Sequence, residues 1–222
     1  RNNDGIDIDG CSNVVVRNCD IDSEDDGICL KSVERPCENV LVERCRVRSS
    51  CNALKFGTAS EKGFINITVR DIEVYDTYLS GIALEIVDGG RMEKVSVYRI
   101  KITGTHNAIF VRLGHRNTKG AVGTIDGVVL SDITAEIPSL PWPDHMAGKF
   151  SPLHEYKHRM LITSSITGVP GQPVRNVTIR NLALVFLRAV LGSAATRGLG
   201  PALFPGCRGP PAFTFFFPPP PP

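Results

Sequence analysis

The chain has 222 residues, and its 25 lysine and arginine side chains nearly balance its 23 aspartate and glutamate side chains, for a formal net charge of +2. A hydrophobic fraction of 42% excludes a chain that is disordered throughout, and the near-neutral charge gives no electrostatic basis for binding nucleic acid. The longest apolar stretch, residues 182–191, contains an arginine and is too short to cross a bilayer. We therefore expect one substantial domain whose partners are neither nucleic acid nor a membrane.

A short motif of alternating β-branched and polar residues recurs along the chain. Its copies begin at Asn13, Asn39, Asn66, Lys94, Gly127 and Asn176. The first three intervals between copies are 26, 27 and 28 residues. Alternation with a period of two predicts a β-strand in each copy, with one face turned toward a core.

A second repeated segment falls between these strands. Its five copies begin at Asp4, Asp26, Cys51, Ser80 and His106, and the second residue of each copy is glycine or asparagine. Because glycine and asparagine tolerate positive φ angles, we expect the same turn once in each repeat.

Strands and turns that recur at this interval predict an all-β fold, a parallel β-helix in which equivalent residues stack about 4.8 Å apart. Cys19 would then stack on Cys45, and a second stack would hold Val15, Leu41, Thr68 and Ser96. A propeller is the weaker alternative, because its blades need about 40–45 residues each.

Six of the seven cysteines lie in the first 51 residues, and the seventh is Cys207. None of them forms a Cys-x-x-Cys pair, so we expect no zinc site. The predicted stack favours core filling for Cys19 and Cys45. Disulfide bonds in a secreted protein stay open as the alternative for the cysteines as a set.

Two segments depart from the repeat. Residues 138–158 contain several prolines and histidines and are expected to form a long inserted loop. From about residue 183 the strand pattern ends, and the chain finishes in a phenylalanine- and proline-rich sequence of low complexity. We therefore divide the chain into a β-helix domain at residues 1–182 and an irregular, disordered tail at residues 183–222.

Three aspartates near the start of the chain are the candidates for chemistry. Asp4 and Asp26 occupy the same position in successive repeats, and Asp25 adjoins Asp26. Stacking would bring the three carboxyl groups within roughly 5–8 Å, where like-charge repulsion makes at least one of them hold its proton. Such a group can act as a general acid, whereas a Ca²⁺ site or a solvated acidic rim is the alternative from the pattern alone.

The sequence Asn2-Asn3-Asp4 followed by Asp25-Asp26-Gly27 resembles two motifs of glycoside hydrolase family 28, the polygalacturonase family. The hallmarks of that family are Asn-Thr-Asp, Asp-Asp, Gly-His-Gly and Arg-Ile-Lys, and the similarity extends to about residue 182. The resemblance implies a right-handed parallel β-helix, or solenoid, that is incomplete at its N-terminus. It also implies a secreted or cell-wall monomer that cleaves an α-glycosidic bond in a pectic polysaccharide with inversion, without metal or cofactor.

The resemblance further implies roles for individual residues. Asp25 would protonate the glycosidic oxygen, and Asp4 and Asp26 would activate the attacking water. Asn2, the first residue of its motif, would contribute to substrate binding.

Two motifs differ from the family at positions that would bind substrate. The Gly-His-Gly position reads Cys51-Asn52-Ala53, so Asn52 replaces the histidine, and the Arg-Ile-Lys position reads Ala83-Leu84-Glu85. Glu85 would repel the carboxylate of a uronic acid, and the candidate replacement cations are Lys31, Lys55 and Arg112. The sequence therefore predicts weak activity on polygalacturonate and better activity on a neutral or differently substituted pectic glycan.

Two other functions stay open on the sequence. A polysaccharide lyase on the same fold would need a basic residue as proton acceptor and usually Ca²⁺. A non-catalytic glycan-binding protein would retain the fold and the sugar-binding face without turnover.

Overall fold

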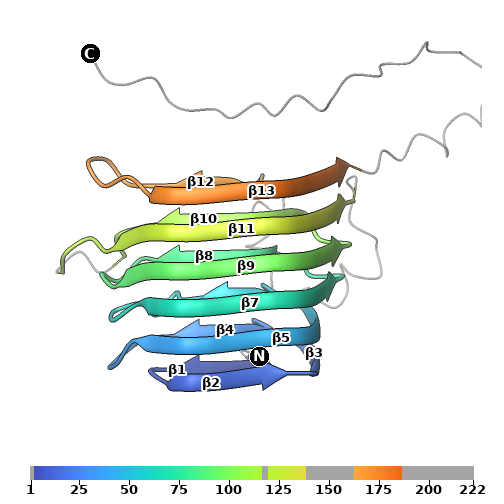
Figure 1. Cartoon of the computed structure of the whole chain (residues 1–222), viewed down its shortest axis with the longest axis horizontal. Coiled ribbons are helices and arrows are strands. Elements are labelled where there is room, and N and C mark those ends of the chain that lie inside the picture. Colours follow the sequence, from blue (N-terminus) through green and yellow to red (C-terminus); the bar gives the residue numbers. More distant parts are fainter. Residues whose placement is uncertain (1–2, 117–119, 139–162, 187–222) are drawn as a thin grey trace, which may run out of the picture. The chain divides into compact units, whose positions relative to one another are not determined.

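The computed structural model describes residues 3–116, 120–138 and 163–186, which form β-strands and no helix (Figure 1). All pairs between these strands are parallel, and the strands make two sheets. The prediction of an all-β fold with parallel strands is confirmed. In the described residues, no helix has the length and hydrophobicity needed to cross a bilayer.

The chain alternates between the two sheets (Figure 1). In spatial order, the first sheet holds β1 (Ile6–Asp9), β4 (Ile28–Lys31), β6 (Leu54–Phe56), β8 (Ser80–Ile86), β10 (Asn107–Leu113) and β12 (Ser165–Thr167). In the same sense, the second sheet holds β2 (Ser12–Arg17), β5 (Cys37–Ser49), β7 (Phe64–Tyr75), β9 (Arg91–Thr103), β11 (Thr124–Ile137) and β13 (Arg175–Phe186), and β3 (Asp20–Ser23) also pairs with β5. Equivalent residues of successive repeats therefore become neighbours.

The core lies between the sheets and consists of columns of stacked aliphatic residues. One column in the second sheet is Val40, Ile67, Val95 and Val128, each at most 2% exposed. The predicted stack of Val15, Leu41, Thr68 and Ser96 is confirmed on the outer face of the same sheet. The alternation of inward and outward residues thus follows the period of two that the sequence shows.

The predicted alignment of the first sheet is wrong by one residue in two repeats. Leu54 pairs with both Ile28 and Ile82, so Ala53, and not Asn52, is equivalent to Gly27. The same shift applies to Asn107, which pairs with Ser80. A slip of one residue would turn Leu54 out of the core, and the burial of this side chain therefore decides the register.

The glycines at this position are needed for space and not for a positive φ angle. Gly5, Gly27 and Gly81 have no positive φ, so the predicted turn is wrong there. A Cβ atom on Gly27 would lie 2.6 Å from the carbonyl oxygen of Ala53 and 2.4 Å from a methyl carbon of Val47. Adjacent repeats thus approach most closely where the sequence has glycine or alanine.

One column of positive φ angles lies instead at the first residue of each strand motif. Asn13, Asn39, Asn66, Lys94, Gly127 and Asn176 all have φ between 50° and 84°. The first three asparagines also form a ladder, in which the Asn39 side-chain amide donates to Asn13 Oδ1 at 3.2 Å and the Asn66 side-chain amide donates to Asn39 Oδ1 at 2.6 Å. Asparagine is suited to this column because its backbone tolerates the left-handed conformation and its side chain can form a hydrogen bond to the asparagine of an adjacent repeat.

We expect Lys94→Asn to stabilise the protein by roughly 1 kcal/mol, because lysine pays a steric cost at φ +54° that asparagine largely avoids. Chemical denaturation of the variant and the wild type would measure the difference. The matched control is Lys101→Asn, an exposed position in the same strand without a positive φ, where asparagine should give no gain. Equal effects at the two positions would contradict the explanation.

The last strand extends beyond the predicted end of the domain. β13 continues to Phe186, four residues past Leu182, because its pairing with β11 runs on through Leu184 with Ala135 and Val185 with Glu136. The rest of the predicted tail, from residue 187, and most of the predicted loop, residues 139–158, lie outside the described residues.

Candidate functional site

The three candidate aspartates lie just before the N-terminal ends of β1 and β4, the first two strands of the first sheet. Asp4 precedes β1 and Asp26 precedes β4, and the Gly5 amide donates to the Asp26 carbonyl oxygen at 2.8 Å. A carboxylate oxygen of Asp4 lies within 4.8 Å of one of Asp26, and Asp25 and Asp26 are equally close. Asp26 is thus the common neighbour of Asp4 and Asp25, and its closeness to Asp4 follows from the stacking of adjacent repeats.

Both oxygens of Asp4 are bound by other groups of the protein. Oδ1 accepts a hydrogen bond from the Asp26 amide at 3.2 Å, and Oδ2 lies 2.7 Å from the Lys31 ammonium. The same ammonium lies 2.9 Å from Asp7 Oδ2. Partial burial alone would lower the pKa of Lys31, but its hydrogen bonds to these two carboxylates outweigh burial and raise it. Asp4 is therefore a fixed carboxylate with a cation in contact.

Asp26 differs from Asp4 in its hydrogen-bond partners, because its Oδ1 accepts hydrogen bonds from a neutral residue and not from a lysine. The backbone amide and the side-chain amide of Asn52 both donate to Asp26 Oδ1, at 3.0 and 2.7 Å. Burial raises the pKa of Asp26, the positive charge of Lys55 and the Asn52 hydrogen bonds oppose that rise, and the charge of Asp25 adds to it. The expectation that one carboxyl of the group holds its proton more tightly is thus met at Asp26.

The corrected register explains the place of Asn52. It occupies the position equivalent to Asp4 and Asp26 and points its amide at the preceding repeat. Sequence reasoning missed this contact because it aligned Asn52 with the glycines. The signal that could have shown it is the hydrophobic Leu54, which must align with Ile28.

Two cysteines border the aspartates. Cys51 lies beside Asp25 and Asp26, and burial, followed by the charges of these two carboxylates, raises the pKa of its thiol. Cys29 is fully buried, donates to the Gly57 carbonyl oxygen at 3.4 Å, and has a pKa raised mainly by burial. Both residues therefore present neutral thiols to the site.

The sets Asp4, Asp26, Cys29 and Asp25, Asp26, Cys51 each bring three potential ligand atoms within 4.8 Å of one another. That spacing could surround a cation. However, Lys31 is bound to Asp4 and Lys55 acts electrostatically on Asp26, so lysine side chains already supply positive charge here. The negative charge of the cluster is thus balanced in part by the protein itself.

The positions expected to bind substrate form a buried ion pair. Lys55 and Glu85, which are 7% and 4% exposed, are joined by a hydrogen bond between Nζ and Oε1. Arg112 is half-exposed, pairs directly across from Glu85 in the sheet, and places Nη1 3.9 Å from Glu85 Oε2. Burial alone would lower the pKa of Lys55, but the charges of Glu85 and Asp26 raise it.

This pairing corrects the expected role of Glu85. Its carboxylate does not stand alone as a source of repulsion, because Lys55 neutralises it and Arg112 lies on its other side. Lys31, the third candidate cation, is engaged by Asp4 and Asp7. Asn2 lies outside the described residues.

The six cysteines in the described residues are free thiols, which contradicts the disulfide alternative for these six. Cys207 lies outside the described residues. Cys19 stacks against Cys45, as predicted, with the Arg46 amide donating to the Cys19 carbonyl oxygen.

We expect a thiol reagent at pH 8 to modify exposed Cys11 first. Cys29, Cys37, Cys45 and Cys51 should react only on unfolding, because burial raises the pKa of each thiol and the thiolate is the nucleophile. Mass spectrometry of peptides from native and denatured protein would follow each site. Cys51 is partly exposed, so rapid labelling of it in the native protein would contradict the raised pKa of its thiol.

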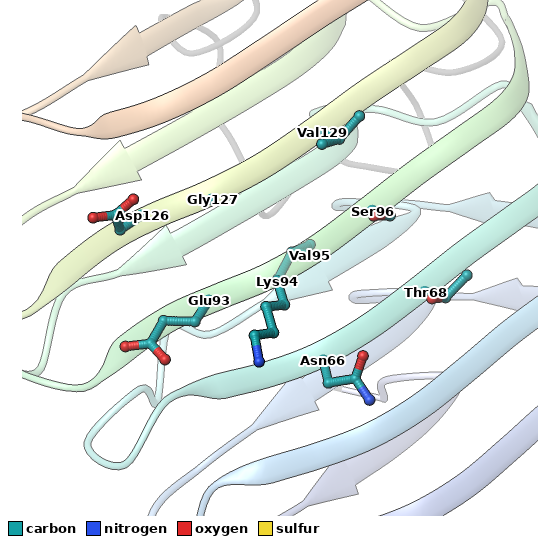
Figure 2. Close-up of a pocket in the computed structure, with 9 residues that line it drawn as sticks. All are labelled: Asn66, Thr68, Glu93, Lys94, Val95, Ser96, Asp126, Gly127 and Val129. Atoms are coloured by element: carbon teal, nitrogen blue, oxygen red, sulfur yellow. The ribbon is translucent and has the colours of Figure 1, made fainter.

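A hollow of about 540 Å³ lies on the outer face of the second sheet, over β7, β9 and β11 (Figure 2). It opens where Gly127 interrupts the column that holds asparagine or lysine in other repeats, beside the short side chains of Thr68 and Ser96. Glu93, Lys94 and Asp126 stand around it. None of the three candidate aspartates lines it, so the hollow and the carboxyl group cluster belong to different sheets.

Comparison with protein-family models and with curated proteins gives no match. The observations that bear on function are therefore the geometry around Asp4, Asp25 and Asp26 and the motif resemblance given above.

Proposed function

We propose that this chain is a glycoside hydrolase of the polygalacturonase type, family 28, which cleaves an α-glycosidic bond in a pectic polysaccharide. The observation that carries the proposal is the cluster of Asp4, Asp25 and Asp26, in which Asp26 has a raised pKa. Acid–base cleavage of a glycoside uses two neighbouring carboxyl groups, one of which carries a proton because its pKa is raised. The parallel pairing in both sheets supports the right-handed β-helix of that family as the finer description of the fold.

The proposed reaction is the attack of water on the anomeric carbon. One carboxylate takes a proton from the water as its oxygen bonds to carbon, while a carboxylic acid gives a proton to the departing glycosidic oxygen as the C–O bond breaks. Asp25 and Asp26 supply this pair. The resemblance assigns proton donation to Asp25, whereas the raised pKa favours Asp26 as the proton carrier. Asp4 is bound through both oxygens, orients Asp26 and pairs with Lys31.

Inversion of configuration rests on the resemblance alone. Inverting enzymes commonly separate their carboxyl groups by roughly 6.5–9.5 Å, and retaining enzymes by roughly 5–5.5 Å. The carboxylate oxygens here approach within 4.8 Å. The anomer released first, followed by NMR, decides the stereochemistry.

A neutral or differently substituted pectic glycan is the proposed substrate, for a reason that differs from the expected repulsion by Glu85. Lys31, Lys55 and Arg112 each lie within 4.0 Å of a carboxylate of the protein. A uronate would have to compete with these internal partners for its counter-ion. A neutral sugar needs only hydrogen bonds and pays no such cost.

The lyase alternative is less well supported. A lyase needs a proton acceptor that is neutral at working pH, whereas the pKa values of Lys31 and Lys55 are both raised, which keeps them charged. As a pectin-degrading hydrolase, the protein would act outside the cell or in a plant wall as a monomer without a cofactor.

Hydrolysis of a panel of pectic glycans tests the proposal. The panel should contain polygalacturonate, its methyl ester and neutral pectic side chains, with reducing ends and ultraviolet absorbance both recorded. We expect new reducing ends without an unsaturated product, fastest on a neutral or esterified glycan, and none above background with Asp26→Asn. An absorbing product would favour the lyase, sugar binding without turnover would favour a glycan-binding protein, and polygalacturonate as the best substrate would contradict the substrate preference.

A further inference from the structure

Lys55 lies between two carboxyl groups, and only one of them bonds to it directly. It pairs in the sheet with Cys29 on one side and with Ala83 on the other, so its ammonium can bond to Glu85, two residues beyond Ala83 on β8. The same ammonium attracts the Asp26 carboxylate from β6 and opposes the effect of burial on it. Both members of the ion pair are almost completely removed from solvent.

We propose that Glu85 is a positioning residue for Asp26: by binding the Lys55 ammonium from the neighbouring strand, it withholds that cation from the Asp26 carboxyl group. The catalytic meaning of this inference rests on the proposed function, although the geometry does not. A buried ammonium with no other partner would pair with Asp26 and hold it ionised. An ionised Asp26 cannot give a proton to a leaving oxygen.

Within the described part of the chain, the other groups around Asp26 are independent of Glu85. The charged or titratable ones are Asp4, with Lys31 bonded to it, Asp25, Cys29 and Cys51, and Asn52 supplies the hydrogen bonds of Asp26. None of these bonds to Glu85, whose ionic partners are Lys55 and Arg112. Glu85 can therefore act on Asp26 through Lys55.

Titration of the Asp26 side chain tests the proposal without any substrate. The carboxyl carbon of Asp26, followed by NMR against pH in the whole chain, should titrate at lower pH in Glu85→Gln than in the wild type, because the freed ammonium turns to Asp26. Arg112→Gln is the matched control, since it removes the other partner of Glu85 and should leave the Asp26 titration close to that of the wild type. An Asp26 titration that is the same in Glu85→Gln and in the wild type overturns the proposal.

The double variant Lys55→Met, Glu85→Gln covers the case in which Glu85→Gln does not fold. It removes both charges of a buried pair, a change that proteins often tolerate. In the double variant no ammonium is left to turn to Asp26, so Asp26 should titrate no lower than in the wild type. A titration below that of the wild type would mean that Glu85 acts on Asp26 through its own charge and not through Lys55, and would overturn the proposal on its own.

Kinetics separate positioning from substrate binding. We expect Glu85→Gln to lower kcat about tenfold, with the acidic limb of its pH profile following Asp26, and to change KM by less than about twofold. A large rise in KM with an unchanged Asp26 titration would make Glu85 a substrate contact and overturn the proposal. If the wild type hydrolyses no glycan, the proposed function fails, while the titrations still decide whether Glu85 controls Asp26.

Discussion

Asp26→Asn should lower kcat by at least about 100-fold, because asparagine can neither give nor accept the proton that the proposed reaction moves. The substitution keeps the shape of the side chain, and the new Oδ1 can still accept both hydrogen bonds from Asn52. Asp25→Asn should cause a loss of similar size. Initial rates on the best glycan of the panel, with folding checked by circular dichroism, would measure both.

The stability of Asp26→Asn should change in the opposite direction from its activity. Because burial raises the pKa of Asp26 above its ordinary value of 3.8, the stability associated with this group is fully present below that value and is lost as the pH rises through the higher folded value. Asparagine does not titrate and avoids this loss. The variant should therefore resist denaturant at pH 7 at least as well as the wild type, and any advantage should disappear near pH 3.

Asp4→Asn is the comparison that assigns the roles. It removes the charge beside Lys31 but leaves an oxygen that can accept from the Asp26 amide, so its loss of kcat should be smaller than that of Asp26→Asn. A folded Asp26→Asn variant that keeps more than a tenth of the wild-type activity would remove Asp26 from the proton transfer. Equal losses in all three variants would mean that the carboxyl groups act as one unit.

Lys55→Met should destabilise the protein by roughly 3 kcal/mol at pH 7, because it leaves the nearly buried Glu85 carboxylate without its cation. Denaturant unfolding of the variant and the wild type at pH 7 would measure the loss. Arg112, on the far side of Glu85, is too exposed to replace the ammonium fully.

The double variant Lys55→Met, Glu85→Met is the control for this second prediction. Replacing both members of a buried ion pair by apolar residues is often neutral or stabilising. The double variant should therefore recover most of the stability that Lys55→Met loses. If it is as unstable as the single variant, the loss comes from the packing of the lysine stem, and not from the unpaired charge.

The repeat in the sequence was sufficient to predict the strands, their parallel stacking and the meeting of Asp4 with Asp26, because these follow from backbone periodicity. It was not sufficient for the register at Asn52, where similarity of residue type to glycine was a poorer guide than the burial of Leu54. The ion pair of Lys55 with Glu85 could not be predicted either. Lys55 pairs in the sheet with Ala83, and its side chain reaches Glu85 two residues further along the strand. Such a contact depends on side-chain rotamers and burial, which cannot be read from the spacing of residues in the sequence.

The stacking of successive repeats also bears on how the chain folds. Val40 meets Ile67 after 27 residues, whereas Val128 meets Val177 only after 49. A near doubling of the closed loop costs about 0.6 kcal/mol more in chain entropy, so docking of β13 is disfavoured relative to pairing of the middle strands. Folding is therefore expected to nucleate among β5, β7 and β9 and to propagate outward, with β13 joining late and fraying first.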